Sequence, residues 1–165
     1  MCESSRPHGE VRPKYISHTP YFALVPERPQ ETLFSRGMLE DVLSNPVTFV
    51  QWVRRGIPGD WLASLVGETG LEHEIAIALG MTSSQLRAAC QADALDARTS
   101  ENVLDLARLL SYCVSVWESH DQAVEWLSHP VHALADQIPM SLLDTFEGRR
   151  WLTEVLYKIE QGDFS

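Results

Sequence analysis

Apolar residues recur at intervals of three and four from about residue 32 onward, and this spacing predicts a series of amphipathic helices. Asn45-Pro46 separates the first two, because asparagine caps a helix and proline fits its first turn. The second helix is expected to end at Gly56, with Arg54 and Arg55 in its last turn, where the helix dipole favours positive charge. The inward positions expected in these two helices are Phe34, Met38, Leu39, Val42, Leu43, Phe49, Val50 and Val53.

Turn and capping residues mark the next boundaries. Residues 58–60 open a third helix, which is expected to end near Gly67. Thr69 and Glu72 have the spacing of a capping box and predict the start of a fourth helix, which Gly80 ends. The inward positions expected here are Trp61, Leu62, Leu65, Val66, Ile75, Ala76 and Leu79.

The same signals continue into the middle of the chain. A second capping box, from Thr82 to Gln85, starts a fifth helix that carries Leu86 and Ala89. The longest helix then covers about residues 100–118, with Thr99 or Ser100 as its cap. Its inward positions are Val103, Leu106, Ala107, Leu110, Cys113, Val114 and Trp117.

Two further helices complete the pattern. Asp121 restarts a short helix that closes before Pro130, whereas Thr145 caps the last helix and Gly162 stops it. The inward positions of the last helix are Trp151, Leu152, Val155, Leu156 and Ile159. No stretch alternates like a strand, so the fold class is all-α. Three parts are expected: an extension over 1–55 (1–30 an arm or disordered, 31–55 helical), a helix-turn-helix domain with its long connecting helix over 56–118, and a C-terminal helical domain over 119–165.

Composition excludes several kinds of chemistry. The three cysteines, Cys2, Cys90 and Cys113, show no CxxC or CxxH spacing, so we expect reduced thiols and neither a disulfide framework nor a zinc site. Residues 1–15 lack the apolar core of a secretory signal, and no apolar run is long enough to cross a bilayer. These features predict a cytoplasmic protein that does not associate with membranes.

No catalytic or cofactor motif is found. Three histidines, His120, His129 and His132, lie close in sequence, but Pro130 prevents a shared helical face and no carboxylate falls at ligand spacing. GxSxG, GxGxxG and phosphate-loop motifs are missing, so we expect a protein that binds other macromolecules rather than an enzyme, with no metal and no cofactor. The tryptophans are distributed one per helix, which favours core anchors: Trp52, Trp61, Trp117, Trp126 and Trp151.

The net charge of −10 is concentrated in the second and third parts of the chain. Residues 1–56 carry seven basic and six acidic side chains, and residues 57–120 carry three and nine. Residues 121–165 carry three basic and eight acidic side chains, which gives −5. Such a surface repels nucleic acid and favours a basic partner, although acidity can also serve solubility alone.

A helix-turn-helix unit is predicted over residues 72–91. Ala76 is small where the second helix would cross the first, and Gly80 suits the left-handed backbone of the turn four residues later. Leu86 and Ala89 would pack the second helix back on the first. The residues that would face a DNA groove are Thr82, Ser83, Ser84, Gln85, Arg87, Ala88 and Gln91.

Two interpretations of that unit remain open. Ser, Gln and one Arg can read base edges, which favours operator binding. However, Arg87 is the only cation on the predicted face and acidic residues flank it, whereas phosphate contacts by Lys and Arg supply most non-specific affinity. The unit could therefore serve folding or dimerisation instead.

The C-terminal segment carries the most specific pattern. It contains the blocks 123–127, 133–134 and 138–148, and ends in Gly162-Asp-Phe-Ser165. It resembles the toxin-binding domain of the Xre/MbcA/ParS antitoxins, which follows a helix-turn-helix module in that family. Residues 103–110 and the entry at 56–58 are also similar to the family, so the resemblance covers about residues 56–165.

The resemblance implies a concrete function. Such antitoxins bind a RES-type toxin, or a relative with an ADP-ribosyltransferase-like fold, that consumes or uses NAD. Their C-terminal domain covers the NAD cleft of the toxin, and their helix-turn-helix domain represses the shared operon. The expected partners are therefore a cognate RES-type toxin, a second copy of the chain in a homodimer, and operator DNA. The alternatives are a transcriptional regulator whose C-terminal domain dimerises or senses a ligand, and an adaptor that has lost DNA binding.

Candidate toxin-binding residues lie on the last helix and after it. With Trp151, Val155 and Ile159 inward, the outward residues are polar or aromatic. Glu154 and Lys158 could simply pair with each other. Phe164 could pack back on its own helix, but an aromatic just past a helix stop is typical of an interface anchor. The full candidate set is Arg150, Glu154, Tyr157, Lys158, Gln161, Gly162, Asp163, Phe164 and Ser165.

Overall fold

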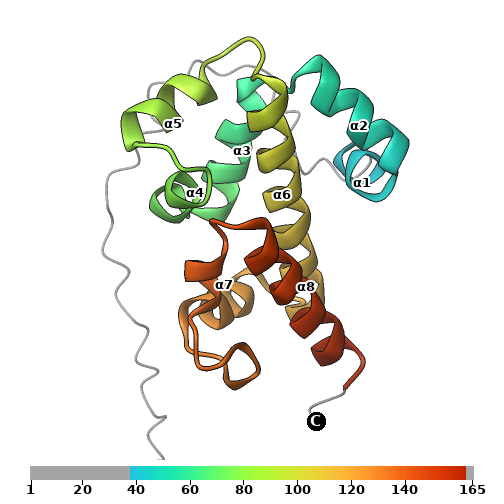
Figure 1. The fold of residues 1–165 in the computed structure, drawn as a ribbon, viewed down its shortest axis with the longest axis vertical. Helices are drawn as coiled ribbons and strands as arrows, with labels where there is room; N and C mark the ends of the chain where they lie inside the picture. Colours follow the sequence, from blue (N-terminus) through green and yellow to red (C-terminus); the bar gives the residue numbers. More distant parts are fainter. Residues whose placement is uncertain (1–37, 163–165) are drawn as a thin grey trace, which may run out of the picture.

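In the computed structural model, which describes residues 38–162, one long helix packs against both the first helices and the C-terminal helices (Figure 1). This helix, α6 (Ala97–Trp117), runs through the middle of the molecule. The shorter helices α1 (Met38–Ser44) and α2 (Pro46–Arg55) flank one side of its first half. The remaining helices are α3 (Gly59–Thr69), α4 (Glu72–Ala78), α5 (Ser83–Cys90), α7 (His120–Ser128) and α8 (Phe146–Glu160).

The expected all-α fold is confirmed. Between α7 and α8 the chain forms two short 3-10 helices, η2 (His132–Leu134) and η3 (Pro139–Leu142). Within residues 38–162 the extended pairing is limited to a single bridge between Val131 and Gln137. None of the helices in this range is long and apolar enough to cross a membrane. The expected arm over residues 1–30 and the position Phe34 lie outside the described residues, as do the side chains of Met38 and Leu39.

The helix caps show how the sequence sets these elements. The Asn45 carboxamide oxygen accepts from the backbone N–H of Val47 at 3.0 Å, as expected. The Thr82–Gln85 capping box forms in both directions, because Gln85 N–H donates to the Thr82 hydroxyl and the Gln85 carboxamide accepts from Thr82 N–H. The Thr145 hydroxyl caps α8 by accepting from Gly148 N–H at 3.0 Å.

Two expected features of the boundary between the third and fourth helices are wrong. The third helix does not end near Gly67 but continues to Thr69, whose hydroxyl donates to the carbonyl of Leu65 at 2.7 Å. Thr69 therefore ends one helix instead of capping the next, and α4 begins without a side-chain cap. The helix break falls at Gly70, which has left-handed backbone geometry with φ of 68°.

The caps of α6 and α7 also differ from the prediction. Asp96, rather than Thr99 or Ser100, caps α6 by accepting from Thr99 N–H at 3.0 Å, so this helix begins three residues early. The Ser100 side chain is buried instead and accepts from Ile57 N–H at 3.0 Å. Similarly, Ser119 caps α7, which begins at His120, one residue before the expected restart at Asp121.

A continuous apolar core joins α3 to α8. Val50 is the main exception to the expected inward positions, with 42% of its surface exposed, because Phe49, Trp52 and Val53 form the inward face of α2. The tryptophans are all half-buried at the edge of the core, where Trp52 packs on Trp61 and Trp117 on Trp126. The largest fully buried side chains are Ile57, Leu62, Leu65, Ile75, Leu86, Leu104, Leu106, Leu127, Leu134, Leu143, Leu152 and Leu156.

The described cysteines lie in or beside this core. Cys113 is fully buried, and burial raises the pKa of its thiol to about 12. Cys90 is half-buried, and burial together with the nearby Glu72 carboxylate raises its pKa to about 11. Both thiols are therefore protonated and unreactive near neutral pH. Cys2 lies outside the described residues.

Candidate functional site

The last helix, α8, presents one apolar and one polar face. Leu152, Val155 and Leu156 are buried against the core, as the sequence pattern predicts. All five candidate residues within the opposite face are exposed: Arg150, Glu154, Tyr157, Lys158 and Gln161. Tyr157 keeps 57% of its surface exposed, so it places a large aromatic ring on the polar face of α8.

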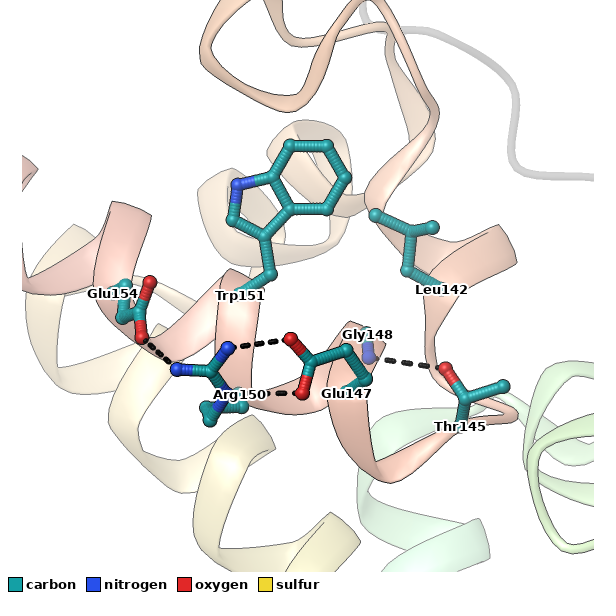
Figure 2. Close-up of a pocket in the computed structure, with 7 residues that line it drawn as sticks. All are labelled: Leu142, Thr145, Glu147, Gly148, Arg150, Trp151 and Glu154. Carbon is teal, nitrogen blue, oxygen red and sulfur yellow. Dashed lines mark hydrogen bonds and ion pairs between the residues drawn. The ribbon is translucent and has the colours of Figure 1, made fainter.

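Arg150 lies between two carboxylates on this face (Figure 2). Its guanidinium donates to Glu147 Oε2 at 3.1 Å and to Glu154 Oε1 at 2.7 Å. The hydrogen bonds and charge of Arg150 lower the pKa of the Glu147 carboxyl, and the same contacts raise the pKa of Arg150. Glu154 thus pairs with Arg150 rather than with Lys158, the partner that helical spacing also allowed.

A hollow of about 440 Å³ opens beside this ion-pair network. Leu142, Thr145 and Trp151 line it together with the three charged residues, as Figure 2 shows. Gly148 lies at its base, where a Cβ atom would overlap the carbonyl oxygen of Leu142. A glycine is therefore required for the first turn of α8 to pack this closely on η3.

The neighbouring residue, Arg149, points the other way and is only 4% exposed. Its guanidinium donates to the carbonyl of Leu143 at 2.7 Å, to the Asp105 carboxylate at 3.0 Å and to the carbonyl of Ala78 at 3.2 Å. These groups belong to the turn before α8, to α6 and to the end of α4, so one buried cation connects three elements. The sequence pattern gave no sign of this role, because two adjacent arginines on a helix do not reveal which of them is buried.

The far end of α8 is tied to α6 by a second polar contact. The Tyr112 hydroxyl donates to Glu160 Oε2 at 2.8 Å. Burial, together with this hydrogen bond and the charge of Glu160, raises the pKa of Tyr112 to about 12. The hydroxyl therefore remains a proton donor over the physiological range, and α8 is fixed near both ends.

The candidate DNA-contacting face lies on α5, away from α8 (Figure 1). Gly80 adopts left-handed geometry, and Met81 N–H donates to the carbonyl of Ala76 at 2.8 Å, which closes α4 in the way the motif requires. Leu86 is buried against the first helix. The other predicted residues, Thr82, Ser83, Ser84, Gln85, Arg87, Ala88 and Gln91, are all exposed.

Asp163, Phe164 and Ser165 lie outside the described residues, whereas Gly162 is exposed and has left-handed geometry with φ of 71° just after α8. Among the described residues no group of histidine, cysteine and carboxylate side chains is arranged to hold a metal ion.

Comparison with known proteins relates α7, α8 and the segment between them to a known family. Residues 114–162 match the model of the antitoxin Xre/MbcA/ParS C-terminal toxin-binding domain. A relative from Sphingobium sp. (strain YBL2), named Prs ADP-ribosylating antitoxin, is 27% identical over 133 residues, which cover 74% of this chain and 84% of the relative. The C-terminal part of the chain is therefore similar to the toxin-binding domain of these antitoxins. This match confirms the resemblance to the Xre/MbcA/ParS antitoxins that the sequence of this segment indicated.

Proposed function

We propose that this chain is an antitoxin, and that it neutralises an NAD-using toxin by covering the toxin's NAD cleft with the outward face of α8 and the residues that follow it. The observation that carries the proposal is that one face of the matched domain presents both an exposed aromatic side chain, Tyr157, and an ordered ion-pair network. Aromatic and arginine side chains of this kind dominate the energetics of protein interfaces.

Charge supports the choice of a cofactor cleft as the target. Residues 121–165 carry a net charge of −5, and a cleft that holds the NAD pyrophosphate is expected to be basic. Arg150 pairs with both Glu147 and Glu154, so this ion-pair network carries a net charge of −1 despite its arginine. Complementary charge would guide the encounter and select against acidic partners.

Two observations support a toxin that uses NAD: the family resemblance and the name of the Sphingobium relative. The family resemblance implies a RES-type toxin, whereas the name of the Sphingobium relative refers to ADP-ribosylation, for which NAD is the donor. Either chemistry requires NAD to enter a cleft, so blocking that cleft inhibits both. The antitoxin would then act as a stoichiometric inhibitor rather than as an enzyme.

Titration of toxin activity tests this proposal. The toxin encoded beside this chain is purified, its NAD consumption is measured, and full-length antitoxin is added at increasing concentration. Tyr157→Ala is expected to raise the concentration needed for half-inhibition by about tenfold or more, as for an interface anchor. Deletion of 163–165 is expected to weaken inhibition while leaving the thermal unfolding midpoint unchanged.

A matched control uses the exposed valine on α2. Val47 is 65% exposed and lies outside the matched domain, so Val47→Ala should inhibit like the unmodified protein. If Tyr157→Ala and the truncated chain also inhibit normally, the α8 face is not the inhibitory surface. If the toxin consumes no NAD and transfers no ADP-ribose, the proposed target class is wrong.

The geometry of α4 and α5 supports a second role, repression of the antitoxin's own operon by a homodimer. The supporting observation is that a complete capping box fixes α5 while its serine, glutamine and arginine side chains remain at the surface. Binding of the purified protein to its own promoter, measured by electrophoretic shift, tests this role. Absence of a shift at low salt, with and without toxin, would exclude it, and light scattering would report whether the chain is a dimer.

A further inference from the structure

Two exposed apolar side chains lie on either side of a second hollow. Phe146, the first residue of α8, is 60% exposed, and Ile77 of α4 is 55% exposed. Both line a depression that also includes Gly80, Arg98, Asn102 and Asp144. This depression connects the helix-turn-helix pair, the start of α6 and the start of the toxin-binding helix.

Phe146 belongs to the same face of α8 as the candidate toxin-binding residues. At about 100° per residue, Tyr157 lies only about 20° around the helix from Phe146, with Arg150 and Gln161 between about 40° and 60°. Phe146 and Tyr157 therefore mark the two ends of one exposed stripe, and both lie inside the domain matched by the family model. The stripe leads directly to Ile77 at its N-terminal end.

The two sides of the depression are held in a fixed relation. Arg149, next in the chain to the ion-pair network, donates to the carbonyl of Ala78 on α4 and stacks its guanidinium 5.2 Å from the centre of the Phe146 ring. Asp105 on α6 holds the same guanidinium at 3.0 Å. Ile77 and Phe146 are thus presented together as a preorganised apolar pair, which reduces the entropy lost when a partner binds.

We propose that the toxin footprint crosses from the toxin-binding domain onto the helix-turn-helix unit at this pair. This inference rests on the proposed function, and extends the surface from α8 to Ile77. The occupant is assigned as the toxin, because the depression continues the stripe that lies in the toxin-binding domain. An apolar pair at the end of a charged face also gives the contact a desolvated anchor, which the ion-pair network alone lacks.

Affinity measurements on the full chain test this extension. Ile77→Gln is the decisive variant, because its side chain is exposed, whereas the Phe146 ring lies against the buried Arg149 guanidinium that Phe146→Gln would disturb. Toxin affinity is measured by calorimetry or surface plasmon resonance, and each variant is checked by thermal unfolding. Ile77→Gln is expected to weaken toxin binding about tenfold with an unchanged unfolding midpoint. Val47→Gln, which also removes an exposed apolar side chain from a helix, should have no effect.

The results separate this inference from the proposed function. If Tyr157→Ala weakens binding but Ile77→Gln does not, the footprint ends on α8 and the inference is overturned while the proposed function stands. If neither variant weakens binding, the assignment of the α8 face fails first. If Ile77→Gln lowers the mass of the isolated antitoxin measured by light scattering but leaves toxin affinity intact, the pair contacts a second copy of the chain, and the inference is also overturned.

Discussion

The two helices assigned to partners, α5 and α8, use their polar side chains in opposite ways. On α5, Thr82 and Gln85 are engaged with each other and with the backbone at the start of their own helix. On α8, the cap is made by Thr145 alone, and the longer charged side chains interact along the outward face instead. The first arrangement stabilises a helix end, whereas the second organises a surface.

The difference extends to the kind of surface that each helix offers. The α5 face consists of small polar side chains and one arginine, and supplies little of the phosphate neutralisation on which DNA affinity depends. The α8 face combines exposed aromatics with paired charges held in place, which suits a partner of defined shape. On the functions proposed above, toxin binding is therefore expected to depend mainly on the α8 face of one copy, extended by Ile77, whereas DNA binding is expected to require two copies of α5.

The largest expected effect concerns the residue that joins the two regions. Arg149→Met removes a buried cation and leaves the Asp105 carboxylate and two carbonyl groups without their donor. The free energy of unfolding is expected to fall by about 3 kcal/mol, measured by urea denaturation. Both the α5 and the α8 surfaces should then lose function together, since Arg149 holds α4 against α8.

The adjacent arginine provides a matched control. Arg150→Met makes the same chemical change one position later, where the side chain is exposed and its carboxylate partners can be solvated instead. Its urea midpoint is expected to match that of the unmodified protein. Equal destabilisation by the two variants would contradict the distinction between a connecting and a surface arginine.

Local signals in the sequence were sufficient for much of the fold. The caps at Asn45, Thr82 and Thr145 are short-range interactions between a side chain and a nearby N–H group, so they could be predicted correctly. Thr69 carries the same type of hydroxyl, but it bonds backward to the carbonyl of Leu65 because α3 continues through Gly67. Spacing alone does not distinguish these two uses of a threonine.

Residues of the candidate toxin-binding site could be predicted from the sequence only where their position follows from helix periodicity. The outward stripe of α8 follows from the 3.6-residue repeat, so Glu154 and Tyr157 could be placed on it from sequence. Arg149 and Ile77 could not be identified in this way, because their roles depend on how α4 packs against α8 across 71 positions of the chain. The residues after Gly162 remain a prediction from the family resemblance.

The second expected effect compares the two caps directly. Thr82→Ala and Thr145→Ala should each cost about 1 kcal/mol of stability, because each leaves an N–H group at a helix start without its acceptor. Hydrogen exchange should localise the loss to the first turn of α5 in one variant and of α8 in the other. Serine at either position should preserve the cap, and exchange spread evenly over both regions would show that the caps do not act locally.

The smallest expected effect concerns the titration of the α8 surface. Arg150 lowers the pKa of Glu147 below its ordinary value of 4.5, so the stabilising contact is present above that value and is lost as the pH falls through the lower pKa of the folded protein. In Arg150→Met the pKa of Glu147, followed by carboxyl NMR shifts, should return toward 4.5. The pKa of Asp96 is lowered instead by hydrogen bonds from Thr99, so it should be the same in both proteins. If the pKa of Glu147 stays low without Arg150, a group other than Arg150 stabilises its carboxylate. The ion pairs would then not organise the α8 surface, which is the feature that separates α8 from α5.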